Sequence, residues 1–174
     1  PEGPWETQER NTIAGWHGWG AAPQLFDKPE YEADRADLAQ RLGDDAYRSA
    51  ARTTLNAHYT DPRIVEAMWE TVSGAGVEGG PVLEPGCGSG EVLAAAPEGF
   101  LGVGVELDPT TARIAQARLG DAHEVVTGNF AEFEVQPGRY AAVVGNVYIC
   151  ERGSSASCFG RIVSPAMPWM VFRS

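Results

Sequence analysis

Two patterns of apolar residues alternate through the middle of this chain. Short runs of strand length occupy residues 82–84, 102–106, 123–127 and 140–144. Between them, apolar residues recur at the three- and four-residue spacing of a helix, over residues 62–73 and 110–119. Strands that alternate with helices are typical of a parallel sheet in an α/β domain. We therefore predict an α/β core built on four strands.

Local residues also predict where the helices begin and end. Asp-Pro pairs at positions 61–62 and 108–109 combine an N-cap with proline in the first turn, and glycines at 74 and 120 end the helices. Two further helices are predicted over residues 31–42 and from about residue 45 to 55, with charged faces and no assigned chemistry. Residues 1–26 are rich in Trp and Gly without a regular period, which predicts an irregular segment held by buried aromatic rings.

A glycine-rich loop follows the first strand, with the sequence VLEPGCGSG at residues 82–90. The strand ends in Glu84, and three glycines at alternate positions precede a helical pattern over residues 91–96. Glycine adopts positive φ at low cost and has no Cβ, so the backbone can turn sharply and approach a ligand closely. Such a loop between a strand and a helix predicts a site for a nucleotide-type ligand.

Residues near the ends of other elements fit the same site. Glu106 ends the second strand about 20 residues beyond the loop, where this kind of fold places a carboxylate that binds ribose hydroxyls. Asn129 and Phe130 follow the third strand, where they could face the base of a nucleoside. The alternative is a turn in which Phe130 belongs to the core. Tyr59 and Thr60, in the loop before the helix over residues 62–73, could contact the same ligand.

Composition and charge limit the classes of function. The 174 residues are 43% hydrophobic, enough for one domain with a core, and no apolar run approaches the ~20 residues of a membrane helix. The net charge of −11 argues against the chain binding the phosphates of a nucleic acid by itself, because such contacts come from Lys and Arg. The three cysteines lack metal-ligand spacing and the first residues lack a secretory pattern, so we expect a cytoplasmic protein without a metal site.

Five segments together resemble a known family: WHGWG at residues 16–20, TLNAHYT at 54–60, VLEPGCGSG at 82–90, GVELDPTTA at 104–112 and VGNV at 144–147. The pattern is similar to that of S-adenosylmethionine-dependent methyltransferases. More narrowly, it resembles the N6-adenine DNA methyltransferase domains of large bacterial, phage and mobile-element proteins, which are often fused to helicase segments. The resemblance implies a Rossmann-like class I methyltransferase sheet, here limited to its first four strands, with an N-terminal helical extension.

The resemblance also implies a role for each candidate residue toward the cofactor S-adenosylmethionine. Tyr59 and Thr60 would line its methionine end, and Glu106 would hold its ribose. The floor beneath the cofactor would be formed by Glu84, Gly86, Gly88 and Gly90. Its adenine ring would be contacted by Asn129 and Phe130.

The catalytic residues that the resemblance implies are Asn146, Val147 and Tyr148. The exocyclic nitrogen of adenine is a poor nucleophile, because its lone pair is delocalised into the ring. An Asn oxygen and a backbone carbonyl can bind its two hydrogens and localise that pair, while an aromatic ring stacks on the flipped base. The chain departs from the family pattern here, since that pattern follows Asn with Pro-Pro or Val-Pro and then Phe or Tyr.

The chain is expected to have three parts. Residues 1–52 form the Trp- and Gly-rich segment with its helices, residues 53–148 form the S-adenosylmethionine-binding core, and residues 149–174 form an irregular tail. The change of composition near residue 148 suggests that this tail is a truncated or frame-shifted end. DNA contacts are then expected through other regions or domains, with a fused or associated helicase as a partner.

Three alternatives to DNA adenine methylation stay open. The chain could be a methyltransferase for RNA, protein or small molecules, or a non-catalytic cofactor-binding or interaction module of a larger helicase-like protein. A nicotinamide-dependent oxidoreductase fits less well. Its fingerprint is Gly-x-Gly-x-x-Gly, whereas the glycines at 86, 88 and 90 are more closely spaced.

Overall fold

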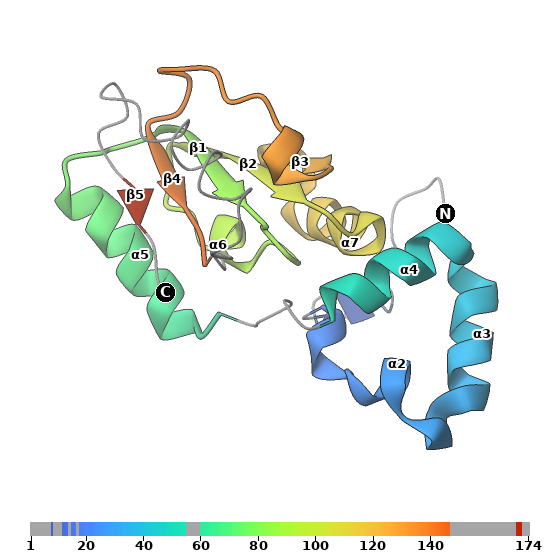
Figure 1. Ribbon diagram of the computed structural model, residues 1–174. Coiled ribbons are helices and arrows are strands. Elements are labelled where there is room, and N and C mark those ends of the chain that lie inside the picture. Colours follow the sequence, from blue (N-terminus) through green and yellow to red (C-terminus); the bar gives the residue numbers. More distant parts are fainter. Residues whose placement is uncertain are drawn as a thin grey trace.

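The computed structural model describes residues 8, 12–13, 15–16, 18–54, 60–146 and 170–171 (Figure 1). Its centre is a parallel sheet with the strand order β3-β2-β1-β4-β5. The strands are β1 (Gly80–Pro85), β2 (Phe100–Glu106), β3 (Glu124–Thr127), β4 (Ala142–Val144) and β5 (Met170–Val171). The predicted α/β class and its four strands are confirmed.

β5 was not predicted, because residues 149–174 show no strand pattern. It is a two-residue strand that pairs with β4, with Met170 opposite Val143 and Val171 opposite Val144. A strand this short has no periodicity of its own, and only its pairing with a distant strand defines it. The other residues of the predicted tail lie outside the described residues.

Three helices accompany the central strands. α5 (Pro62–Gly74) precedes β1, α6 (Glu91–Ala94) connects β1 to β2, and α7 (Pro109–Leu119) connects β2 to β3. α6 is one turn long, shorter than the helical pattern over residues 91–96 indicates. Short 3-10 turns follow at η3 (Gly120–Ala122) and η4 (Phe130–Glu132).

The predicted caps of α5 and α7 are confirmed. The Asp61 carboxylate accepts a hydrogen bond of 2.9 Å from the backbone N–H of Arg63. The Asp108 carboxylate accepts one of 2.8 Å from the N–H of Thr111. Each bond satisfies one of the N–H groups that the first helical turn leaves unpaired.

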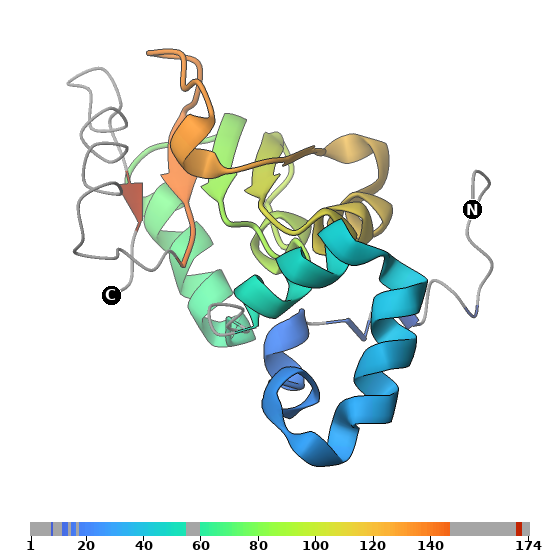
Figure 2. The same cartoon turned by 45° about the vertical axis from the view of Figure 1, so that its right-hand side comes forward.

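The N-terminal part contains more helix than the sequence indicates. Its elements are η1 (Trp19–Ala21), α2 (Gln24–Asp27), η2 (Pro29–Tyr31), α3 (Glu32–Leu42) and α4 (Asp44–Thr53). The two longer helices are confirmed. η1 and α2 fall where we predicted an irregular segment, since turns of three or four residues are too short to show a helical period. Figures 1 and 2 show α2, α3 and α4 to one side of the sheet, with α4 nearest to α7.

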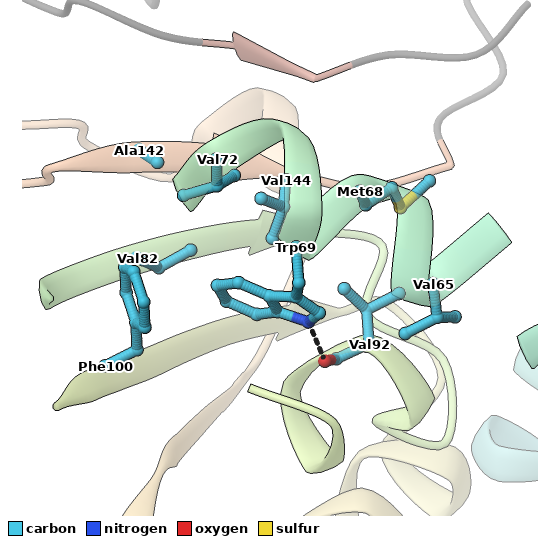
Figure 3. Close-up of a cluster of buried hydrophobic side chains, with 9 residues drawn as sticks. All are labelled: Val65, Met68, Trp69, Val72, Val82, Val92, Phe100, Ala142 and Val144. Carbon is cyan, nitrogen blue, oxygen red and sulfur yellow. Dashed lines mark hydrogen bonds between the residues drawn. The ribbon is translucent and has the colours of Figure 1, made fainter. Parts of the chain in front are cut away.

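One face of the sheet packs against α5 and α6. Trp69 of α5 lies at the centre of this cluster (Figure 3), and its indole N–H donates a hydrogen bond of 2.9 Å to the carbonyl oxygen of Val92 in α6. Its ring centroid lies 5.0 Å from that of Phe100 in β2. The buried face of α5 is therefore the predicted apolar face, which also contributes Val65, Met68 and Val72.

The opposite face of the sheet packs against the connection between β3 and β4. The side chains of Leu83, Val105 and Val143 there belong to a cluster with Phe130 and Phe133. The chain runs outward from β1 to β3 and then returns to β4 on the other side of β1. Right-handed crossovers in opposite directions must cover opposite faces of a sheet. The carboxyl ends of β1 and β4 thus form the switch point at which α/β sheets bind ligands.

Two glycines in β2 allow α6 and the glycine loop to lie close to the sheet. A Cβ on Gly102 would lie 2.6 Å from the Leu93 side chain, and one on Gly104 would lie 2.6 Å from the Cys87 sulfur. Real Cβ atoms do not approach other atoms so closely. The loop after β1 can therefore pack onto β2 only because these positions lack side chains.

Candidate cofactor site at the carboxyl ends of the strands

The glycine loop bends at three alternate positions. Gly86, Gly88 and Gly90 have φ angles of 63°, 55° and 82°, a region that residues with side chains rarely adopt. A Cβ on Gly86 or Gly88 would meet nothing within 4 Å, whereas one on Gly90 would lie 3.1 Å from the Leu119 side chain. Gly86 and Gly88 therefore border open space beyond β1, and Gly90 packs against α7.

The Glu106 carboxylate lies against this loop. Its Oε2 accepts a hydrogen bond of 3.0 Å from the backbone N–H of Gly88, and its Oε1 accepts one of 2.8 Å from the N–H of Asp108. Glu106 is 8% exposed. Burial raises the pKa of its carboxyl group, and the two backbone hydrogen bonds partly oppose that rise.

This arrangement leaves Glu106 able to accept further hydrogen bonds. A carboxylate oxygen has two lone pairs, so each oxygen keeps one after accepting a single N–H. The backbone already holds both oxygens of Glu106 in place. A ligand that binds them therefore loses little affinity to the ordering of this side chain. The vicinal hydroxyls of a ribose offer a pair of donors that suits such an acceptor.

Glu84 lies at the end of β1, opposite Gly104 of β2. It is buried, and its Oε2 has no hydrogen-bond partner among the described residues. Burial raises the pKa of Glu84 well above its ordinary value, and the negative charges of Glu91 and Glu106 add to the rise. A buried carboxyl group in this state favours a bound proton or a nearby cationic group.

Cys87, within the loop, is a free and buried cysteine. Burial raises the pKa of its thiol well above the ordinary value, and the neighbouring Glu84 and Glu106 raise it further. A protonated, buried thiol is inert, because the thiolate is the reactive form. Across the part of the chain that the structure describes, no group of three or more His, Cys, Asp or Glu side chains could hold a metal ion.

Asn129 and Phe130 follow β3, as predicted, but both have partners within the protein. The Asn129 side-chain oxygen accepts a hydrogen bond of 3.0 Å from the N–H of Ala131 and so caps η4. Phe130 is half-buried against the core cluster of Leu83 and Val105, and its ring stacks on Phe133. The turn-and-core alternative describes these contacts, and an adenine contact by either residue stays a prediction.

Thr60 lines a groove between α5 and the region of α6, and its contact with a cofactor stays a prediction. The groove has a volume of about 510 Å³, and Pro62, Trp69 and Glu91 are among its other lining residues. Its floor is largely apolar, and it begins near the N-terminus of α5. The other residue predicted for the methionine end, Tyr59, lies outside the described residues.

Asn146 lies at the carboxyl edge of the sheet, two residues beyond β4. β4 pairs in parallel with β1, with Val143 opposite Leu83. Continuing this register brings Asn146 level with Gly86, and Asn146 is half-buried there. The structure therefore brings Asn146, the glycine loop and Glu106 to one edge of the sheet. The remaining two predicted catalytic residues lie outside the described residues: Val147 and Tyr148.

Two further residues belong to this edge and were not predicted as site residues. Leu107, directly after Glu106, is 44% exposed, which is unusual for a large apolar side chain in the described part of this protein. It offers an apolar surface beside Glu106, and its place after the strand-end acid was visible in the sequence. Asp108, expected only to cap α7, also binds Glu106 through its backbone N–H.

Comparisons with known proteins give a likeness in fold. No protein-family model and no curated protein matches the chain. Among solved structures, it is similar to an RNA methyltransferase from Salinibacter ruber in complex with S-adenosyl-L-homocysteine, with 22% identity and a TM-score of 0.44. That match covers 52% of this chain and 61% of the other.

Two more of the similar structures are named as methyltransferases. A proposed S-adenosyl-L-methionine-dependent methyltransferase from Methanococcus maripaludis is 18% identical, over 79% of this chain and 57% of that one, with a TM-score of 0.48. Phosphoethanolamine N-methyltransferase 2 from Haemonchus contortus, in complex with S-adenosyl-L-methionine, is 17% identical, over 88% and 34%, with a TM-score of 0.49. The chain spans less than two thirds of the length of each of these three proteins.

Proposed function

We propose that this chain binds S-adenosylmethionine at the carboxyl ends of β1 and β2, as the cofactor-binding part of a methyltransferase. One observation carries the proposal. The Glu106 carboxylate is held by the backbone N–H groups of Gly88 and Asp108, beside a loop with three positive-φ glycines. A fixed acceptor next to an open, side-chain-free loop suits a ribose whose remaining atoms lie along that loop.

The described residues fit this cofactor at several points. Glu106 would accept the ribose hydroxyls, Leu107 would lie along the adenine ring, and Gly86 and Gly88 would leave room for the backbone to approach the ligand. When bound, S-adenosylmethionine supplies a methyl group on a positively charged sulfur. The role of this chain is to bind and orient that group, because well-oriented reactants need no covalent intermediate.

Glu84 supports this cofactor over a dinucleotide. Its carboxyl group is buried two positions before Gly86, and one of its oxygens has no partner among the described residues. A dinucleotide would bring the negative charge of its pyrophosphate to this loop, and a negative charge there is disfavoured by Glu106 and, when it is ionised, by Glu84. S-adenosylmethionine carries an ammonium group and a sulfonium ion instead, and both are attracted to buried acids.

For the reaction, we propose transfer of the methyl group to the N6 position of adenine in DNA. The resemblance of the VGNV segment supports this choice, together with the place of Asn146 at the edge that carries Glu106. An Asn oxygen there could accept a hydrogen bond from the amino group of a flipped adenine. Because the net charge is −11, we propose that other regions or a fused or associated helicase supply most of the DNA contacts.

Calorimetric titration with S-adenosylmethionine and S-adenosylhomocysteine tests the cofactor proposal, with NAD as the competing ligand. We expect S-adenosylmethionine and S-adenosylhomocysteine to bind, and NAD to bind at least about tenfold more weakly. That difference corresponds to about 1.4 kcal/mol in the free energy of binding. Circular dichroism establishes that the titrated chain is folded. No heat of binding at millimolar ligand, from a folded chain, would reject the proposal, and tighter binding of NAD would reassign the site to a dinucleotide.

A non-catalytic binding module is the second candidate, because Asn146 is followed by Val147, Tyr148 and Ile149 without the family's proline. Transfer of a labelled methyl group to DNA and to RNA separates the candidates. We expect transfer to DNA, reduced roughly 100-fold by Asn146→Ala, with exposed Gln136→Ala as the unchanged control. Cofactor binding without transfer to either nucleic acid would favour the binding module. Transfer to RNA alone would show that the substrate is RNA and not DNA.

A further inference from the structure

We propose that Trp19, far from the site in sequence, is a positioning residue for the ribose acceptor. Its indole N–H holds the Asp108 carboxylate, and through Asp108 it holds the Glu106 carboxylate in the position that binds the ribose hydroxyls. This inference rests on the proposed cofactor site. It assigns a function to the N-terminal aromatic segment, which the sequence predicted only as packing.

A chain of short hydrogen bonds joins the three residues. The Trp19 Nε1–H donates to Asp108 Oδ2 at 3.1 Å, in a buried bond between residues 89 positions apart. The Asp108 backbone N–H donates to Glu106 Oε1 at 2.8 Å. The Gly88 N–H holds the other oxygen of Glu106 at 3.0 Å. Glu106 is thus fixed on one side by the glycine loop and on the other by Asp108.

Asp108 is anchored through its side chain as well as through its backbone N–H. Asp108 is the N-cap of α7, in an extended conformation with φ −81° and ψ 116°. One oxygen, Oδ2, accepts from Trp19 and from both the N–H and the hydroxyl of Thr111, whereas Oδ1 has no partner among the described residues. Thr111 therefore restrains the carboxylate from within α7, and Trp19 supplies the restraint from outside the helix.

The N-terminal segment holds Trp19 firmly enough to act on Asp108. The Trp19 ring makes edge contacts with Trp16 at 4.6 Å and with Phe26 of α2 at 5.8 Å between centroids. Arg118, in the last turn of α7, donates to the backbone carbonyls of Trp16 at 3.1 Å and Ile13 at 3.2 Å. The segment is thus bound to α7 near both ends of that helix, at Asp108 and at Arg118. Trp19 itself is 8% exposed.

The same aromatic pair supplies a matched control. The indole N–H of Trp16 is buried, but it has no hydrogen-bond partner within the described residues. Trp16→Phe and Trp19→Phe each delete one indole N–H and shrink one ring. Only Trp19→Phe breaks a hydrogen bond to Asp108. A difference between the two variants therefore reports the loss of that bond rather than the loss of aromatic surface.

Calorimetric titration of the wild type and both variants tests the inference, with S-adenosylhomocysteine and its 2′,3′-dideoxy analogue as ligands. We expect Trp19→Phe to weaken binding of S-adenosylhomocysteine by about 3- to 10-fold, because a hydrogen bond to a charged group is lost one step from the ligand. The dideoxy analogue should bind all three proteins equally, since it has no hydroxyls for Glu106. Trp16→Phe keeps the bond between Trp19 and Asp108, so it should bind S-adenosylhomocysteine more tightly than Trp19→Phe does.

A second variant keeps the test decisive if Trp19→Phe does not fold. Thr111→Val removes the hydroxyl bond to the same Asp108 oxygen without changing the N-terminal segment, and we expect the same loss confined to the hydroxyl-bearing ligand. The inference fails if the folded variant binds S-adenosylhomocysteine as tightly as the wild type, or if both ligands weaken equally. A wild type that binds neither ligand rejects the proposed function itself, which is a different result.

Discussion

The backbone N–H of Gly88 donates a hydrogen bond of 3.0 Å to the carboxylate of Glu106. This bond connects the loop after β1 to the end of β2, across 18 positions of sequence. The conformation of the loop and the position of the acceptor are therefore interdependent. A change at either residue should therefore alter ligand binding.

The first prediction concerns Gly88→Ala. Gly88 has a φ of 55°, so we expect a backbone cost of about 1–2 kcal/mol in the free energy of unfolding. The added Cβ meets no protein atom within 4 Å, so it projects toward the space where we place the ligand. Affinity for S-adenosylhomocysteine should therefore fall at least about tenfold, which calorimetry and urea unfolding can measure side by side.

Gly76→Ala is the matched control for this prediction. Gly76 also has a positive φ, 84°, and its added Cβ also meets nothing within 4 Å, but it lies in the turn after α5. We expect a similar loss of stability with unchanged affinity. Equal effects on affinity in the two variants would contradict a ligand site over Gly88.

The second prediction concerns Glu106→Gln. Glutamine keeps the size of the side chain, but it has no charge and turns an amide toward one of the two backbone N–H donors. We expect S-adenosylmethionine binding to weaken by about 1–3 kcal/mol, since hydrogen bonds to a charged acceptor are lost. Exposed Glu98→Gln removes the same charge elsewhere and should bind as the wild type does. Unchanged binding by Glu106→Gln would remove the ribose role.

The third prediction concerns the buried carboxyl of Glu84. Its raised pKa means that the folded protein keeps a proton that the unfolded chain releases above about pH 4.5. The stabilisation that protonated Glu84 contributes is complete below that pH and is lost as the pH rises through its folded-state pKa. Glu84→Gln should therefore make stability less dependent on pH across this range, as measured by urea unfolding at a series of pH values.

The same variant should bind S-adenosylmethionine more weakly than the wild type, although its stability near neutral pH is equal or higher. Opposite effects on stability and binding are typical of a buried acidic group that is kept for a ligand. A parallel loss of both would indicate that Glu84 is a structural residue. Unchanged binding would contradict its proposed role in favouring a cationic cofactor.

The fourth prediction concerns His123 and acid. The backbone N–H of Gly102 donates to His123 Nδ1 at 2.8 Å, so the imidazole must be neutral at this nitrogen. Burial lowers the pKa of His123 below its ordinary 6.5, so the unfolded chain takes up a proton first. The bond's contribution is therefore present above pH 6.5 and is lost as the pH falls through the lowered pKa of the folded protein.

His123→Gln isolates this effect, because its side-chain oxygen can accept the same N–H at every pH. The buried Glu84 and Glu106 titrate with the opposite sign, and they do so equally in both proteins. The difference in unfolding free energy between the two proteins should therefore follow the histidine alone. A difference that stays constant with pH would exclude the titration of His123 as its cause.

Much of the fold could be predicted from local residue patterns. The caps at Asp61 and Asp108 depend on residues within three positions of each other, and the structure contains both. The place of Glu106 at the end of β2 followed from an apolar run and its length. Interactions this short in range are encoded in neighbouring residues, so they can be predicted before the rest of the chain is placed.

Phe130 shows where local pattern was insufficient. The sequence offered two alternatives for it, a face for the nucleoside base or a core position. Packing against Leu83 and Val105 gives it the core position, because the connection between β3 and β4 covers that face of the sheet. The local sequence cannot show which side of the sheet a crossover takes.

The sequence by itself determined the glycine loop, the strand-end acid and the order of β1 to β4 and of the longer helices along the chain. Only the tertiary structure decided that Gly88 and Asp108 together hold Glu106, and that Trp19 reaches Asp108 from 89 positions away. The physical reason is that a hydrogen bond depends on the distance and angle between its atoms, whatever their separation along the chain. Those distances exist only once the sheet and its N-terminal helices have packed together.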